Sequence, residues 1–225
     1  MTTAAITPTF PAAMTMALKT QFTAEEFYQA LGDLDNEILE SKNLKEVLPI
    51  KLICGGGFVA ISHLRLRETT DDINFILDPQ VKGQTKIRAK LRRAIENVAA
   101  YRGLTREWLN SRMEVFAVGN TKMHLFRDSL DQNVILWQGK NLVLYAVKWE
   151  WSLARKLKRI GSSNRSIDLD DAVAILRKMV DEKGGPLQRS TVKDLDQIVY
   201  TPIEDSVLDR VALAYNLTYG TPGIV

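Results

Sequence analysis

Cysteine and histidine are almost absent from this chain of 225 residues. The single cysteine, Cys54, cannot form a disulfide within the chain, and we therefore expect a reducing compartment, the cytoplasm. The two histidines, His63 and His124, are too few to build an ordinary zinc site with one cysteine. These absences argue against a disulfide-stabilised secreted protein and against a zinc enzyme.

Long apolar runs are also missing. No segment approaches the ~20 residues that a membrane-spanning helix needs, so we expect no membrane partner. The first 20 residues are rich in Thr, Ala and Pro and contain no arginine, which fits neither a secretory signal nor a mitochondrial presequence. We expect residues 1–20 to be a flexible tail.

The net charge is small, but the charges are unevenly distributed. Thirty basic residues against 27 acidic ones give a net charge of +3, too mild to indicate nucleic-acid binding alone. The basic residues gather in two clusters, at residues 82–93 and 155–165. With 45% hydrophobic residues, the chain is typical of a globular protein that buries a sizeable core.

The order of periodic segments predicts an α+β protein. Thr23-Ala-Glu-Glu26 has the form of a capping box and precedes apolar residues at helical spacing, which predicts a helix over 23–41. Further helices are expected at 58–66, 84–101, 149–160, 169–180, 191–198 and 203–215. Strands are expected at 49–54, 73–76, 113–118, 133–136 and 142–147. We therefore expect an α+β core over 21–147, followed by a C-terminal helical bundle over 148–225.

The segment from Gly55 to Asn74 has a pattern suited to phosphate chemistry. Gly55-Gly56-Gly57 follows a strand, and glycines allow backbone amides to approach a phosphate closely. Asp72 and Asn74 are two residues apart on a strand, so their side chains face the same side. Two oxygen ligands on one face could hold Mg²⁺ or Mn²⁺ against nucleotide phosphates. Three nearby polar residues could contact phosphate or support the carboxylate: Arg67, Thr69 and Thr70.

This arrangement resembles the nucleotidyltransferases of the DNA polymerase beta superfamily, which carry a Gly-Gly or Gly-Ser turn, a short helix and a later strand with Asp-x-Asp. Arg67-Glu-Thr-Thr-Asp-Asp72 is also similar to the pattern of abortive-infection-type nucleotidyltransferase toxins and of uncharacterised fungal nucleotidyltransferase-like proteins. Those families have a downstream helical lysine, matched by Lys156, and an Asp-x-x-Asp, matched by Asp168 and Asp171. The matching blocks span most of residues 50–224.

The resemblance implies a nucleotidyltransferase-type mixed sheet with flanking helices. It also implies an activity, the metal-dependent transfer of a nucleoside monophosphate from a nucleoside triphosphate to RNA such as tRNA or to a protein hydroxyl. Asp72, Asn74 and Lys156 would be the catalytic residues. The resemblance further implies that Lys156 and the glycines Gly55, Gly56 and Gly57 bind the phosphates, and that Asp168 or Asp171 completes the site or fixes Lys156.

Asn74 departs from the pattern, because an aspartate is expected there. An amide oxygen can bind Mg²⁺ but brings no negative charge, and two divalent ions need several carboxylates. A third carboxylate is expected on a neighbouring strand, where Glu114 in 113–118 is the candidate.

Two alternatives to an active enzyme therefore stay open. One is a catalytically impaired protein of the same fold that binds a nucleotide or a partner. The other is a basic interaction module that uses the helix over 84–101, where Lys86, Lys90 and Arg93 share one side.

Overall fold

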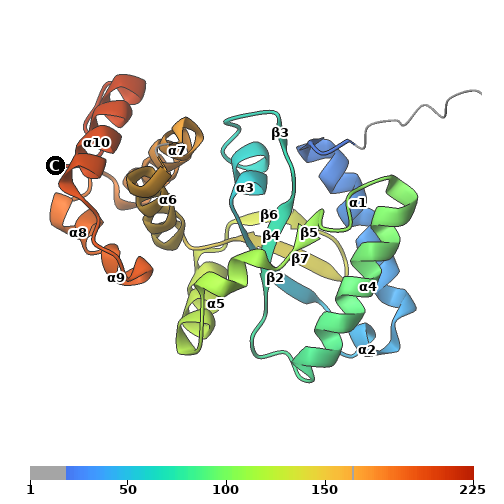
Figure 1. Ribbon diagram of the computed structural model, residues 1–225. Helices are drawn as coiled ribbons and strands as arrows, with labels where there is room; N and C mark the ends of the chain where they lie inside the picture. The colour runs from blue at the N-terminus through green and yellow to red at the C-terminus, as the bar shows by residue number, and fades with distance from the viewer. Residues whose placement is uncertain (1–18, 164) are drawn as a thin grey trace, which may run out of the picture.

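A mixed five-stranded sheet forms the centre of the protein (Figure 1). The computed structural model describes residues 19–163 and 165–225, so most of the expected tail over residues 1–20 lies outside the described residues. The strand order is β5-β4-β2-β7-β6. The strands are β2 (Ile50–Gly55), β4 (Ile73–Leu77), β5 (Leu109–Asn110), β6 (Ile135–Gln138) and β7 (Leu142–Ala146). The protein is thus α+β, with a mixed sheet and flanking helices.

The pairing directions bring four strand ends to one edge of the sheet. The central strand β2 runs antiparallel to β4 and parallel to β7, and β4 runs parallel to β5. Gly55 therefore pairs with Asn74, and Asn74 pairs with Asn110. Because β7 is parallel to β2, the helix α6 (Trp149–Ser163) begins at this same edge.

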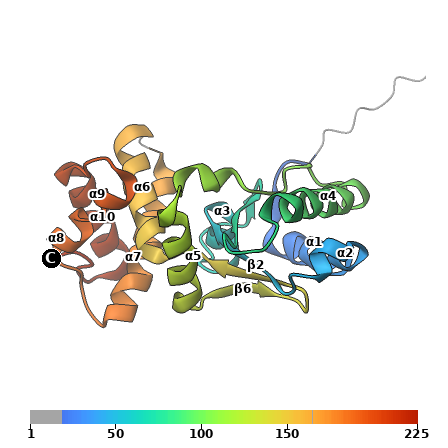
Figure 2. The same cartoon turned by 90° about the horizontal axis from the view of Figure 1, so that it is seen from below.

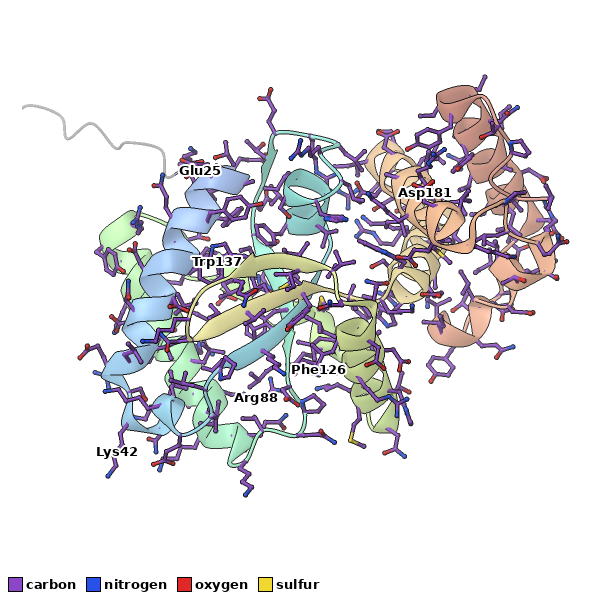
Figure 3. The ribbon with its side chains drawn as sticks, turned by 180° about the vertical axis from the view of Figure 1, so that it is seen from behind. Glu25, Lys42, Arg88, Phe126, Trp137 and Asp181 are labelled. Atoms are coloured by element: carbon purple, nitrogen blue, oxygen red, sulfur yellow. The ribbon has the colours of Figure 1, made fainter. Side chains whose placement is uncertain are left out.

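The two faces of the sheet pack against different helices. Leu52 and Cys54 of β2 belong to the main hydrophobic core, which includes apolar residues of α1 (Ala24–Glu37), α3 (Gly57–Ser62) and α4 (Gln84–Arg102). Ile53 lies between them in sequence and belongs to a smaller cluster with Phe126 of α5 (Asn120–Gln132), labelled in Figure 3. This alternation follows from the two-residue period of a strand. Asn74 alternates with Ile73 and Phe75, so it lies on the face covered by α5.

The N-terminal helix begins where the sequence predicts it. The Glu26 amide donates to the Thr23 hydroxyl at 3.3 Å, and the Thr23 amide donates to the Glu26 carboxylate at 2.9 Å. This capping box is followed by α1, the 3-10 helix η1 (Ile38–Glu40) and α2 (Lys42–Lys45). The helix predicted over 84–101 is confirmed by α4.

The strand predicted over 113–118 is wrong. Arg112–Phe116 forms a 3-10 helix, η2, and the helix α5 that follows was not predicted. Met113 and Ala117 are buried at 6% and 0% exposure, whereas Val115 between them is 69% exposed. Buried residues four apart with an exposed residue between them suit a helical turn, not the two-residue alternation of a strand.

The chain after β7 contains only helices in its named elements. They are α6, α7 (Ser166–Lys183), α8 (Arg189–Lys193), α9 (Asp196–Val199) and α10 (Asp205–Tyr219). Two short helices replace the single one predicted over 191–198. Figures 1 and 2 show these helices together at one end of the molecule, with α1, α2 and α4 at the other. Between residues 19 and 225, leaving out 164, no helix is both long and apolar enough to cross a membrane.

Candidate functional site

A cleft of about 190 Å³ lies where the sheet edge meets the C-terminal helices. Its walls come from the Gly55-Gly56 turn, from β4 through Asn74, from η2, and from α6 and α7. Five of the residues singled out in the sequence line it: Gly55, Gly56, Asn74, Lys156 and Asp171. The parallel pairing of β2 with β7 explains this convergence, because it places the start of α6 beside the glycine turn.

The presence of glycine at each of these three positions has a different structural explanation. A Cβ at Gly55 would lie 3.2 Å from the Val147 side chain, so the strand end is tightly packed. A Cβ at Gly57 would collide with the Thr70 side chain. Gly56 has φ +75° and ψ −137°, a conformation that favours glycine, and no atom lies within 4 Å of its Cβ position. Gly56 is therefore the point of this turn that a ligand can approach most closely.

The two threonines serve a small second sheet. β3 (Thr69–Thr70) pairs antiparallel with β1 (Phe22–Thr23), and the Thr69 hydroxyl donates to the Gln21 side chain at 2.7 Å. Neither Thr69 nor Thr70 lines the cleft. Their contacts support the turn that leads to Asp72.

The Asp72 carboxylate is held by two side-chain amides. Asn74 Nδ2 donates to Asp72 Oδ1 at 2.8 Å, and Asn110 Nδ2 donates to Asp72 Oδ2 at 2.8 Å. The expected placement of Asp72 and Asn74 on the same side of the chain is thereby confirmed. Burial raises the pKa of Asp72 above the ordinary aspartate value, although the hydrogen bond from Asn110 and the charge of Arg112 act in the opposite direction.

Asn110 occupies the place on the neighbouring strand where a third carboxylate was expected. It is 6% exposed, and its Nδ2 also donates to the Glu107 carbonyl at 2.9 Å. Its Oδ1 accepts from the Arg112 amide at 3.0 Å, which fixes the NH₂ group toward Asp72. No feature of the sequence pointed to this residue, because β5 has only two residues and begins 35 residues beyond Asn74.

Glu114, the carboxylate suggested from the sequence, lies elsewhere. It sits on η2 and forms ion pairs with Arg88 at 2.6 Å and Lys122 at 3.0 Å, Arg88 coming from α4 (Figure 3). It also accepts from the Leu77 amide at 3.3 Å. Leu77 is five residues along β4 from Asp72, a distance of roughly 16 Å at the rise of an extended strand. Glu114 therefore does not join Asp72.

These donors do not fit the pair of divalent ions that the resemblance implies. Such ions need several carboxylates, whereas the sheet edge offers Asp72 with two neutral amides. The Asn110 oxygen is turned away from Asp72 by its bond to the Arg112 amide. In the parts of the chain that the structure describes, no group of three or more His, Cys, Asp or Glu side chains could hold a metal ion.

Lys156 lies in a buried network of paired charges. Its Nζ donates to Asp168 at 2.9 Å and to Asp171 at 2.6 Å, and both carboxylates are almost fully buried. Arg67 donates to the other oxygen of Asp171 at 2.6 Å, and Arg159 lies 3.2 Å from Asp168. Both aspartates thus fix Lys156, and Arg67 connects the segment after α3 to α7.

Arg155 faces the cleft without such pairing. Its guanidinium lies 3.6 Å from the centre of the Phe116 ring and 6.0 Å from that of Trp151. Burial lowers the pKa of Arg155, and the positive charge of Arg159 adds to this effect. Among the ion pairs of residues 19–163 and 165–225, Arg155 has no carboxylate partner. The sequence placed Arg155 only within a basic run, and its position facing the cleft was not predicted.

The fold and the site together define an α+β protein with a mixed five-stranded sheet and a cationic cleft between the sheet edge and the C-terminal helices. The family described as a domain of unknown function (DUF7582) matches residues 37–222, and the chain belongs to this family. The match covers every residue of the cleft. Comparisons with curated proteins and with solved structures gave no match.

Proposed function

We propose that this chain binds a nucleoside triphosphate in its cleft and is impaired in nucleotidyl transfer. In this proposal the sheet is of the nucleotidyltransferase type and the C-terminal helices form a bundle against it. The observation that carries the proposal is the environment of Asp72, whose two oxygens accept from Asn74 and Asn110.

The chain order around the cleft supports the choice of ligand. β2 leads into the glycine turn, α3 and the β3 segment, and then into β4, whose first residue follows Asp72. The Gly56 backbone is open to close approach. Cationic side chains of α6 line the same cleft, and Phe116 at 48% exposure offers an aromatic surface. A polyphosphate needs cations and open backbone amides, and a base favours an aromatic surface.

The impairment follows from the chemistry of the donors. Metal-assisted transfer uses divalent ions to neutralise charge on the attacking and leaving oxygens. One carboxylate with two amide donors directed at it cannot replace the carboxylate set that holds such ions.

Two measurements on the full chain test the proposal. Nucleoside triphosphates should raise the unfolding temperature, since a ligand that binds only the native state stabilises it. Labelled nucleoside triphosphates with Mg²⁺ or Mn²⁺ should give no labelled product on total RNA or protein above the level of Asp72→Ala. Labelled product that Asp72→Ala abolishes would instead identify an active nucleotidyltransferase, and the acceptor that carries the label would be its substrate.

A charge-reversed variant of α4 provides the control. Lys86, Lys90 and Arg93 do not line the cleft, so reversing their charges should leave nucleotide stabilisation unchanged. If nucleotide stabilisation is lost in this variant, the basic helix and not the cleft would be the binding surface.

A further inference from the structure

The cationic side chains at the cleft differ in how far carboxylates neutralise their positive charge. Lys156 is bound by the buried Asp168 and Asp171, and its charge is already balanced. Arg112 lies 3.7 Å from Glu107. Arg159 contacts Asp168 on one side only and keeps 41% of its side chain exposed. Within residues 19–163 and 165–225, Arg155 has no carboxylate partner, so the net positive charge of the cleft is concentrated on α6.

Arg155 is also held in place before any ligand arrives. Its guanidinium lies flat enough on Phe116 to approach the ring centre at 3.6 Å, and Trp151 lies on the same helix at 6.0 Å. A stacked guanidinium keeps its N–H donors directed around its own plane, where they suit two phosphate oxygens at once. An arginine ordered in this way loses little side-chain entropy when an anion binds.

We propose that the cleft binds the polyphosphate of its ligand directly, without a divalent cation, through Arg155 with Arg159 beside it. This inference rests on the proposed function and deepens it. The arginines supply the positive charge that metal ions would otherwise supply, and the amide-bound Asp72 leaves no carboxylate set to bring a metal ion to the phosphates. Lys156 is then a positioning residue, which holds α6 against α7.

Titration calorimetry with inorganic triphosphate and with ATP tests this inference, in EDTA and in excess Mg²⁺. We expect both ligands to bind in EDTA, with affinity that falls as salt is raised. Arg155→Gln should weaken binding by about tenfold or more, because a charge-assisted hydrogen bond to phosphate is lost. Arg155→Lys should recover part of the loss, since it restores the charge without the planar fork.

Arg177→Gln is the matched control. Arg177 also lies over an aromatic ring, at 5.1 Å from the Tyr219 centre, and pairs with Asp181, which Figure 3 labels on α7. It does not line the cleft, so its loss should leave both affinities unchanged. Unfolding midpoints of both variants check that the fold is retained.

The outcomes separate this inference from the proposed function. Binding of ATP that requires Mg²⁺ would overturn the inference and leave the proposed function intact. Binding in EDTA that Arg155→Gln does not weaken would overturn the assignment to Arg155. Equal affinity for triphosphate and ATP would support the phosphate contacts and contradict a nucleotide-specific site. No binding of either ligand in either buffer would overturn both.

Discussion

Asp72 near the sheet edge and Lys156 among the C-terminal helices have oppositely arranged charges around them. At the sheet edge, the carboxylate of Asp72 is surrounded by neutral amides from Asn74 and Asn110. At the helical end, Lys156 is bound by two buried carboxylates, Asp168 and Asp171. Asp72 is thus held by neutral donors, whereas Lys156 is held by two carboxylates of opposite charge.

This difference identifies the Lys156 network as a structural cluster. A buried ion pair contributes to stability only while all its partners are present, because removing one leaves an uncompensated charge in a poor solvent. The Lys156 network connects α6, α7 and the segment carrying Arg67, so it fixes the shape of the cleft. The surroundings of Asp72 contain one carboxylate, which accepts hydrogen bonds from two neutral amides.

The largest expected effect on stability comes from the Lys156 network. Lys156→Met leaves Asp168 and Asp171 without their shared cation, and we expect it to lower the free energy of unfolding by about 3–5 kcal/mol. Urea unfolding measures this change. The control is Arg92→Met, which removes an exposed ion pair with Glu96 and should cost at most about 1 kcal/mol. Equal losses in the two variants would contradict a structural role for the network.

Asn110→Asp tests the surroundings of Asp72. It removes the donors to Asp72 and to the Glu107 carbonyl and adds a like charge, so we expect a loss of about 2–3 kcal/mol near neutral pH. Mn²⁺ should recover part of this stability, because the variant carries two carboxylates side by side. Asn74→Asp should cost less, since within the described residues the Asn74 side chain donates to Asp72 alone, whereas Asn110 donates to two acceptors. A wild-type protein that Mn²⁺ stabilises as strongly as Asn110→Asp would contradict our account of the donors.

The pH dependence of stability tests the environment of Asp72. Its pKa is raised mainly by burial, so the folded state holds the proton more tightly than the unfolded state. The contribution of Asp72 to the free energy of unfolding is fully present below about pH 4, the ordinary aspartate pKa. It is lost as pH rises through the higher pKa of the folded state. The stability of Asp72→Asn relative to wild type should therefore increase with pH over this window. A stability difference between Asp72→Asn and wild type that does not change with pH would contradict this environment for Asp72.

The smallest expected effect is at the ring beneath Arg155. Phe116→Leu removes the aromatic face at 3.6 Å from the guanidinium, a contact worth about 0.5–1 kcal/mol at a partly exposed site. We expect a loss of a few fold in affinity for inorganic triphosphate in EDTA and little change in the unfolding midpoint. An affinity unchanged from wild type would show that Arg155 does not need the ring for its orientation.

Local signals predicted much of the fold. The capping box at Thr23 and the apolar spacing over 84–101 depend on neighbours three or four residues apart, and both predictions are confirmed. The segment over 113–118 failed because Met113, Val115 and Ala117 are apolar at alternate positions, as in a strand. Only packing decides that Val115 faces outward while the other two are buried.

The site was predicted only in part, for a similar reason. The glycine turn and Asp72 belong to one continuous segment, and their proximity follows from chain order. Asn110 reaches Asp72 through a two-residue strand that pairs with β4 far along the chain. Glu114 was a reasonable candidate by residue type, but Arg88 and Lys122 bind it at another part of the sheet.

The sequence by itself determined the helices with strong periodicity, the central strands, and the turn from Gly55 to Asp72, because these depend on interactions between near neighbours. Only the tertiary structure decided which polar groups surround Asp72 and which cation of α6 faces the cleft without a carboxylate partner in the described part of the chain. Adjacent residues on a helix point about 100° apart. Consequently Lys156 faces the buried aspartates of α7 while Arg155 faces the cleft, an arrangement that depends on how α6 and α7 pack.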